Sequence, residues 1–251
     1  MKIWVITLFP EMFDGFCQSG VIGQTLQGLR ATQEDATIEL VPVQLRDHSP
    51  KNFKGVDDSP YGGGAGMVIR ADVLLHALIN GVVAPGNYGD DYREKLHIIF
   101  PSPHGKTWEH NYCRDFASRH YNVDSKQRKD LVFICGRYEG IDQRFIDLYV
   151  DEMISLGDFI LTGGELAVMA ILDSSLRFHS GVLGNKESAE SESFAGEEKL
   201  LEYPQYTRPR EFERQLVPDV LTSGNHREIE KWRQAKSREF STKRKLLDDK
   251  E

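Results

Sequence analysis

The sequence predicts an α/β fold built on a mostly parallel sheet. Two observations support this prediction. Short apolar runs alternate along the chain with segments of helical periodicity, which is the order expected of repeated strand–helix units. In addition, residues 131–135 (LVFIC) are continuously apolar, as expected of a strand that is buried on both faces of a parallel sheet.

Each expected element follows from its own local pattern. The strands are short apolar runs, at residues 3–8, 37–43, 96–100, 131–135 and 152–155. The helices between them are residues 21–29, 71–80, 108–119 and 143–149. A further helix is expected over residues 163–178, capped by Thr162 and with Glu165 favourably placed in its first turn. The apolar stripe of this helix consists of Leu166, Met169, Ala170 and Leu176.

Loops rich in glycine or proline follow three of these strands. They are residues 101–105 (PSPHG), 136–140 (GRYEG) and 156–165 (LGDFILTGGE). Ligands of open α/β sheets bind at the carboxyl ends of the strands. The three loops are therefore expected to form one rim around a ligand site.

The character of the chain changes after Gly184. Residues 185–196 are rich in serine and glutamate and nearly free of large apolar side chains, so they cannot pack a core. We therefore expect a first domain of residues 1–184, a flexible linker of residues 185–202 and a small helical domain of residues 203–251. The last domain is basic, with eight lysines and arginines against three glutamates over residues 226–245. This charge suits contact with phosphates, although a solvated helix face explains it about as well.

Charge, hydropathy and cysteine content limit the classes of protein to which this chain could belong. The formal charge of −8 argues by itself against a nucleic-acid partner, in contrast to the basic C-terminal region. The apolar start of the chain is too short for a signal peptide, and no run approaches the roughly 20 apolar residues of a membrane span. A cytoplasmic location is therefore expected. Three cysteines without a close pair suggest neither a disulfide framework nor a structural zinc site.

Several familiar motifs are excluded by their spacing. Residues 105–107 (GKT) look like the end of a phosphate-binding P-loop, but Phe100 stands where that motif needs its first glycine. The glycine-rich residues 60–67 lack the spacing of a dinucleotide-binding loop and follow a polar segment rather than a strand. No signature of a zinc or serine hydrolase is present.

Five other segments, taken together, closely resemble the bacterial tRNA (guanine-N1)-methyltransferase family of the SPOUT superfamily. They occur in the order of the family and span nearly the whole chain. The segments are 58–67 (DSPYGGGAGM), 135–142 (CGRYEGID), 156–166 (LGDFILTGGEL), 206–209 (YTRP) and 223–226 (SGNH). Each is weak alone, but five in order are specific.

The resemblance implies a fold, a reaction and partners. The fold would be a SPOUT-type parallel sheet with helices on both faces and a C-terminal trefoil knot, followed by a small helical domain. The enzyme would be a homodimer with active sites shared between subunits. It would transfer a methyl group from S-adenosylmethionine to N1 of the guanosine 3′ of a tRNA anticodon. The family is also described as needing a divalent cation, usually Mg²⁺, whose ligands this sequence does not reveal.

This reaction needs a base to remove the N1 proton and a cation to stabilise negative charge on O6. By resemblance the base is Glu192, which stands where the family has Asp, and Glu190 is a second candidate. The resemblance assigns the catalytic arginine to Arg177. Without it, Arg177 would be expected to form a surface ion pair with Asp173, and Glu192 to be a solvated linker residue.

Two sets of binding residues follow from the same resemblance. The donor-binding set is Pro101, Gly136, Tyr138, Leu156, Gly157, Phe159, Leu161, Gly163 and Gly164. The set expected to bind tRNA is Asp58, Tyr61, Gly62, Asn225 and His226. His104 replaces the usual Gln of the family, and Glu139 lies in the same rim without an assigned role. Trp232, on the basic C-terminal helix, is more often a packing residue than a platform for a base.

Two alternative functions are weighed against this one. The chain could be a knotted methyltransferase that acts on a ribose 2′-hydroxyl or on ribosomal RNA. It could also be an RNA-binding protein that keeps the fold without catalysis, and the Asp-to-Glu difference at Glu192 is the feature that favours this alternative.

Overall fold

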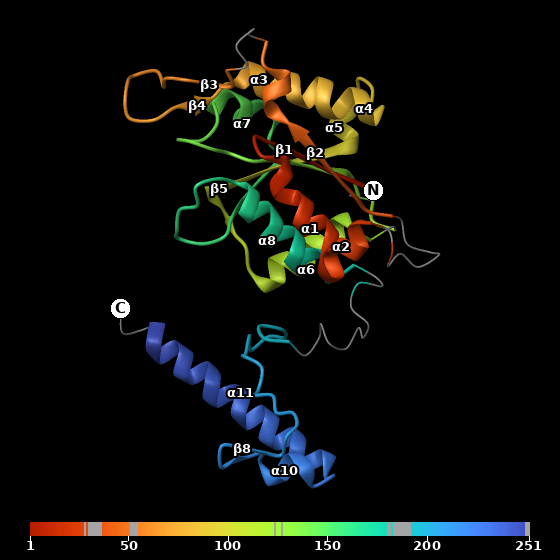
Figure 1. Ribbon diagram of the computed structural model, residues 1–251, viewed down its shortest axis with the longest axis vertical. Helices are drawn as coiled ribbons and strands as arrows, with labels where there is room; N and C mark the ends of the chain where they lie inside the picture. Colours follow the sequence, from red (N-terminus) through yellow and green to blue (C-terminus); the bar gives the residue numbers. More distant parts are fainter. Residues whose placement is uncertain are drawn as a thin grey trace. The chain divides into compact units, whose positions relative to one another are not determined.

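The computed structural model describes residues 1–27, 29, 37–50, 55–122, 124–126, 128–179, 182 and 192–248. It divides into two compact units, Met1–Gly184 and Asn185–Glu251 (Figure 1). None of the helices among the described residues is long and apolar enough to cross a membrane.

The first unit is organised around a five-stranded sheet in the order β2-β1-β6-β5-β7. All four strand pairs are parallel. The strands are β1 (Lys2–Thr7), β2 (Glu39–Gln44), β5 (Leu96–Thr107), β6 (Asp130–Ile134) and β7 (Glu152–Ser155). The predicted parallel sheet is thus confirmed. The central strand β6 is buried from Leu131 onward, which explains its unbroken apolar run.

Helices cover both faces of this sheet (Figure 1). Alternate side chains of β1 divide between two cores, so that Ile3 and Val5 enter one and Trp4 and Ile6 enter the other. The first core lies under α1 (Asp14–Gln18), α2 (Gly20–Leu26), α6 (His110–His120) and α8 (Glu165–Leu176). The second lies under α3 (Ala71–His76), η3 (Ala77–Val83), α5 (Tyr92–Lys95) and α7 (Gln143–Tyr149).

Short elements complete the first unit. They are the 3-10 helices η1 (Pro10–Phe13) and η2 (Leu45–His48), the helix α4 (Ala84–Gly86) and the small antiparallel pair β3 (Asp57–Asp58) and β4 (Val68–Ile69). The predicted helix over residues 71–80 is longer in the structure, where α3 is followed directly by the π-helix η3 that extends to Val83.

The prediction for the start of helix α8 is wrong. Helix α8 begins at Glu165 rather than at residue 163, and its N-cap is Gly164, without a side-chain cap. The prediction that Thr162 caps this helix therefore fails. The Gly164 N–H instead donates to the Gly136 carbonyl over 2.9 Å, which draws the start of the helix against the end of β6.

The second unit contains the hairpin β8 (Glu211–Phe212) and β9 (Gln215–Leu216), the short helix α10 (Asp219–Thr222) and the long helix α11 (His226–Asp248). In the segment predicted as linker, residues 192–202 are described, and the Leu201 N–H donates to the Ser241 hydroxyl of α11 over 2.8 Å. Trp232 packs against Tyr206, with 6.2 Å between the ring centroids. Within this unit, Trp232 is therefore a packing residue.

Candidate functional site

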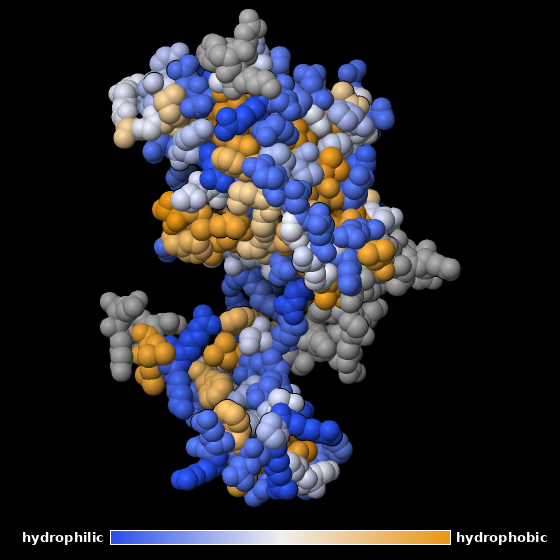
Figure 2. Space-filling model, in the orientation of Figure 1, coloured by the Kyte–Doolittle hydropathy of each residue, from blue (hydrophilic) through white to orange (hydrophobic). Residues whose placement is uncertain are grey.

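A pocket of about 280 Å³ opens at the carboxyl ends of three neighbouring strands of the sheet. Its walls come from residues 100–103 of β5, from residues 136–140 after β6, and from residues 154–157 and 159–164 at the end of β7 and in the loop that follows. These loops, expected from the sequence to form one rim, do meet at one site. Figure 2 shows hydrophobic side chains gathered over the loop between β7 and α8, where Phe159 and Ile160 are exposed.

All nine residues expected to bind the donor line this pocket. They are Pro101, Gly136, Tyr138, Leu156, Gly157, Phe159, Leu161, Gly163 and Gly164. Their side chains are apolar or absent, apart from the Tyr138 hydroxyl. A ligand here would therefore be held by apolar contacts and by the peptide groups of the loops.

Close backbone approach explains why glycine is needed at Gly164. A Cβ there would lie 2.9 Å from the Cα of Cys135, so a side chain would push the loop away from β6. A different constraint operates at Tyr138, which has a φ of 60° and so adopts the left-handed conformation that non-glycine residues avoid. This strained turn places Tyr138 on the rim of the pocket, where its side chain is 53% exposed.

A buried ion pair connects two walls of the pocket. Glu165 is fully buried, and one of its carboxylate oxygens lies 2.9 Å from an Arg137 guanidinium nitrogen. Its other oxygen accepts a 2.7 Å hydrogen bond from the Thr7 hydroxyl of β1. The Arg137 guanidinium also lies over the Phe9 ring, 4.4 Å from its centroid, and donates to the Thr162 carbonyl over 3.3 Å.

The sequence did not predict this ion pair. It placed Glu165 in the first turn of a helix for its effect on the helix dipole, whereas the structure buries the carboxylate against Arg137. The two residues come from different loops of the rim, and no local pattern marks them as partners. The ion pair joins the loop after β6 to the start of α8, so it fixes two walls of the pocket relative to each other.

The cysteines carry no reactive role at this site. All three are free thiols. Burial raises the pKa of Cys135 well above its usual value, and the nearby Glu165 carboxylate adds to the effect. Burial also raises the pKa of Cys113 to about 11. Both thiols are therefore protonated at neutral pH and are poor nucleophiles.

The glycine-rich residues 59–67 approach the pocket through Glu139. The Glu139 N–H donates to the Met67 carbonyl over 3.0 Å, and a Cβ on Gly66 would lie 2.4 Å from the Glu139 carboxylate. Glu139 itself lines the pocket. Tyr61, at the other end of this loop, is 98% exposed.

The residues predicted to bind tRNA are not among those that line the pocket. Asp58 is exposed on β3, and Gly62 has a φ of 88° in the glycine-rich loop. Asn225 and His226 are exposed at the start of α11 in the second unit, where the Asn225 side-chain carbonyl accepts from the Glu228 N–H over 3.4 Å. Their expected role in binding tRNA stays a prediction.

The two predicted catalytic residues belong to different units. Arg177 follows the last residue of α8 and is half-buried in the first unit. Helix α8 starts at the pocket, so its rise of about 1.5 Å per residue puts the Arg177 backbone roughly 20 Å from Gly164. Glu192 is half-buried in the second unit, and Glu190 lies outside the described residues. The structure thus brings together the donor set, whereas the catalytic pair is divided between the two units.

Comparison with known proteins gives a consistent result over nearly the full length. A family model described as tRNA (guanine-1)-methyltransferase TrmD matches residues 1–249. A tRNA (guanine-N(1)-)-methyltransferase of Geobacter sulfurreducens is 43% identical over 241 residues, which cover 96% of this chain and 88% of that protein. The enzyme of the same name from Clostridium botulinum strain Hall is 44% identical over 237 residues, covering 94% and 87% of the two chains. A third, from Carboxydothermus hydrogenoformans, is 42% identical over 237 residues, covering 94% and 83%.

Proposed function

Because the chain belongs to the tRNA (guanine-1)-methyltransferase family, we propose that it transfers a methyl group from S-adenosylmethionine to N1 of a guanosine in tRNA. The observation that carries the proposal is the pocket at the three strand ends, which contains every residue expected to bind the donor. The target would be the guanosine directly 3′ of the anticodon, as the resemblance of the sequence implies.

The pocket fits the chemistry of this donor. S-adenosylmethionine carries a flat adenine, and the apolar Leu156, Phe159 and Leu161 offer contacts suited to such a ring. Gly157 and Gly163 have no side chain, so their peptide groups can reach the polar edge of a base. When bound, the donor supplies an electrophilic methyl group for an in-line displacement, which depends mainly on positioning.

The residues of the chain would supply the acid–base chemistry. Glu192 would accept the N1 proton of guanine, and the Arg177 guanidinium would stabilise negative charge on O6. The Glu192 side chain is about one methylene longer than the Asp of the family, so its loop would sit ~1 Å further from the guanine. A divalent cation, usually Mg²⁺ in the family, would assist, and Glu139 is the pocket carboxylate available to it.

A homodimer with shared active sites is part of the proposal, and the length of α8 supports it. Ala167 is the last residue of α8 that lines the pocket, and the helix rise of ~1.5 Å per residue puts the Arg177 backbone ~15 Å beyond it, which is more than an arginine side chain spans. Arg177 would therefore serve the pocket of a second copy. The basic residues of α11 would contact the tRNA backbone.

The proposed fold includes the trefoil knot of the superfamily. Two features support it. Strand β5 pairs with β7 both before and after the loop of residues 102–105. The chain after β7 then returns to the end of β6, where Gly163 bridges Arg137, before it enters α8.

Methyl transfer to tRNA transcripts tests the function directly. Radiolabel from S-adenosylmethionine should enter a transcript with guanosine 3′ of the anticodon, should be lost when that base is adenosine, and should be recovered as N1-methylguanosine. Label on a ribose or on ribosomal RNA would favour the alternative methyltransferase. Donor binding without any transfer would favour a binding protein.

Two variants test the role of the proposed base. Glu192→Gln should reduce turnover by ~10²-fold or more and leave donor affinity within a few-fold, because it removes the base without touching the pocket. Glu197→Gln, in the same unit, is the control and should keep its turnover. Equal activity of the Glu192 and Glu197 variants would exclude Glu192 as the base.

Mixing inactive chains tests the shared site. Arg177→Ala removes the guanidinium group, and Leu161→Asp places a negative charge in the donor pocket. A mixed dimer of these two chains contains one site with an intact pocket and an intact arginine from the other chain. Partial recovery of activity is expected on mixing, and its absence despite subunit exchange would show that each chain supplies both groups to one site.

A further inference from the structure

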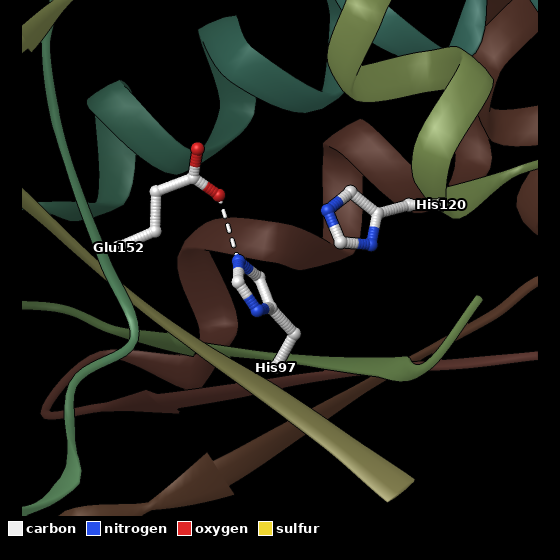
Figure 3. A group of neighbouring side chains, drawn as sticks. All are labelled: His97, His120 and Glu152. Carbon is white, nitrogen blue, oxygen red and sulfur yellow. Dashed lines mark hydrogen bonds and ion pairs between the residues drawn. The ribbon is translucent and has the colours of Figure 1, made fainter. Parts of the chain in front are cut away.

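Two histidines and a glutamate meet at the end of the sheet opposite the pocket. His97 is the second residue of β5, Glu152 is the first residue of β7, and His120 is the last residue of α6. The pocket is formed at the carboxyl ends of β5 and β7, whereas this cluster sits at their amino ends. Figure 3 shows the three side chains pointing toward one another from separate elements.

The geometry of the cluster resembles a set of metal ligands. One donor atom from each residue can be chosen so that all lie within 4.8 Å of one another. The His97 Nε2 lies 2.7 Å from a Glu152 carboxylate oxygen, Oε2. The His97 and His120 rings are 4.8 Å apart between centroids. His120 is only 2% exposed, and its Nδ1 has no hydrogen-bond partner among the described residues.

The surrounding groups orient these ligands. Tyr112 and Arg119 both donate to Oε1 of Glu152, over 2.5 and 3.2 Å, so that Oε2 remains directed at His97. The other ring nitrogen of His97, Nδ1, lies 3.9 Å from a carboxylate oxygen of Asp151. Protein metal sites commonly have such outer partners, which fix the ligating carboxylate and the orientation of each imidazole.

We propose that His97, His120 and Glu152 bind a divalent transition-metal ion of the zinc class. Two imidazoles and one carboxylate suit Zn²⁺, Co²⁺ or Ni²⁺ better than Mg²⁺, which prefers oxygen ligands. The site is separate from the pocket, because it lies at the other end of these strands. A bound ion would join β5, α6 and β7, and its binding free energy would add to the stability of the fold.

A neighbouring arginine also bears on the site, because an Arg119 guanidinium nitrogen lies 3.4 Å from Nε2 of His120. Arg119 is a competing positive charge, offset in part by its ion pair with Asp115, 3.0 Å away.

Cobalt spectroscopy on the full-length protein tests the site without any mutation. The protein is stripped with EDTA and titrated with Co²⁺, whose visible absorption reports the coordination geometry. We expect intense tetrahedral bands that saturate at one ion per chain and disappear when Zn²⁺ is added. Only the weak spectrum of hydrated Co²⁺ would overturn the proposal.

Variants then identify the ligands. His97→Gln and Glu152→Gln keep polar side chains of similar size, and each should weaken Zn²⁺ binding in calorimetry by at least ~10-fold. Zn²⁺ should raise the unfolding temperature of the unmodified protein and fail to raise it in these variants. His76→Gln, at the exposed end of α3, is the control and should bind as the unmodified protein does. Unchanged Zn²⁺ affinity in the His97 and Glu152 variants would place the metal elsewhere and refute the assignment.

Discussion

Gly105 lies where the chain of β5 passes closest to the backbone of β7. A Cβ at this position would be 2.4 Å from the Ile154 nitrogen and 2.4 Å from the Met153 carbonyl carbon. Both of these atoms belong to the backbone, so no side chain can rotate to make room. Residues on either side of Gly105 pair with Ile154, which means that the contact cannot relax without disturbing the pairing of the two strands.

The size of the disturbance follows from these distances. Ordinary contacts of a Cβ begin near 3.4 Å, so Gly105→Ala must move β5 and β7 apart by about 1 Å. Overpacking of this kind costs on the order of 1–3 kcal/mol of the free energy of unfolding. Ile154 and Leu156 also line the pocket, and a ~1 Å misplacement at a catalytic site can cost ~10²-fold in rate.

Urea unfolding and calorimetric titration with S-adenosylmethionine measure the two effects. Gly15→Ala is the matched control, because Gly15 lies in α1 and a Cβ added there would meet no atom within 4 Å. The control should gain about 0.4–1 kcal/mol in the free energy of unfolding and keep its donor affinity. Gly105→Ala should lose stability and bind the donor at least ~10-fold more weakly. Identical behaviour of the two variants would refute this account of the β5–β7 contact.

Three further predictions concern the buried polar groups. Glu165→Gln removes the charge opposite Arg137 and should lower the free energy of unfolding by about 3–5 kcal/mol in urea titrations; a loss below about 1 kcal/mol would contradict the ion pair. Thr7→Val removes the hydroxyl that donates to Glu165 and should cost about 1–3 kcal/mol by the same measurement, whereas no loss would show that the carboxylate finds another donor. Burial lowers the pKa of His120 from 6.5 to about 3, so that the unfolded chain binds an extra proton between these values. In EDTA, stability should therefore fall as pH drops below 6.5, by up to ~1.4 kcal/mol per unit. His120→Phe should flatten this dependence above pH ~5, where other carboxyl groups contribute less, and an unchanged slope would assign the effect to another group.

The strands and the position of the pocket could be predicted because both depend on local pattern. A strand buried on two faces needs an unbroken apolar run, and residues 131–135 provide one that overlaps β6 almost completely. Glycine-rich loops after parallel strands lie at one edge of the sheet whatever the exact strand order is. The sequence therefore predicted the edge, whereas a single pocket also requires that β5, β6 and β7 be neighbours, which only the structure shows.

The full length of β5 could not be predicted in the same way. Residues 101–105 contain two prolines and a glycine, which normally end a strand, so the expected strand stopped at Phe100. In the structure β5 continues to Thr107, because Lys106 and Thr107 pair with β7 beyond an irregular loop. Gly105 looked like part of a rejected phosphate-binding motif, and its actual role is to allow two strands to approach each other.

The proposed metal-binding cluster could not be predicted from the sequence for a different reason. His97, His120 and Glu152 are separated by more than 20 residues from one another, and none of their local patterns is typical of a metal site. Only the pairing of β5 with β7 and the end point of α6 bring them together. Short spacings between ligands mark those metal sites that lie on one helix or turn, whereas sites assembled from three elements leave no such signal.

The proposed role of Arg177 depends on the family resemblance and on the geometry of α8 together. Its resemblance to the catalytic arginine of the family suggests a role for the residue and is silent about the chain whose pocket it would serve. The geometry of α8 is silent about chemistry, yet it places the Arg177 backbone ~15 Å along the helix from Ala167, where α8 last lines the pocket, because a helix rises about 1.5 Å per residue. An arginine side chain is shorter than this distance. The proposed catalytic role of Arg177 therefore depends on the proposed homodimer, in which the arginine would serve the pocket of a second copy.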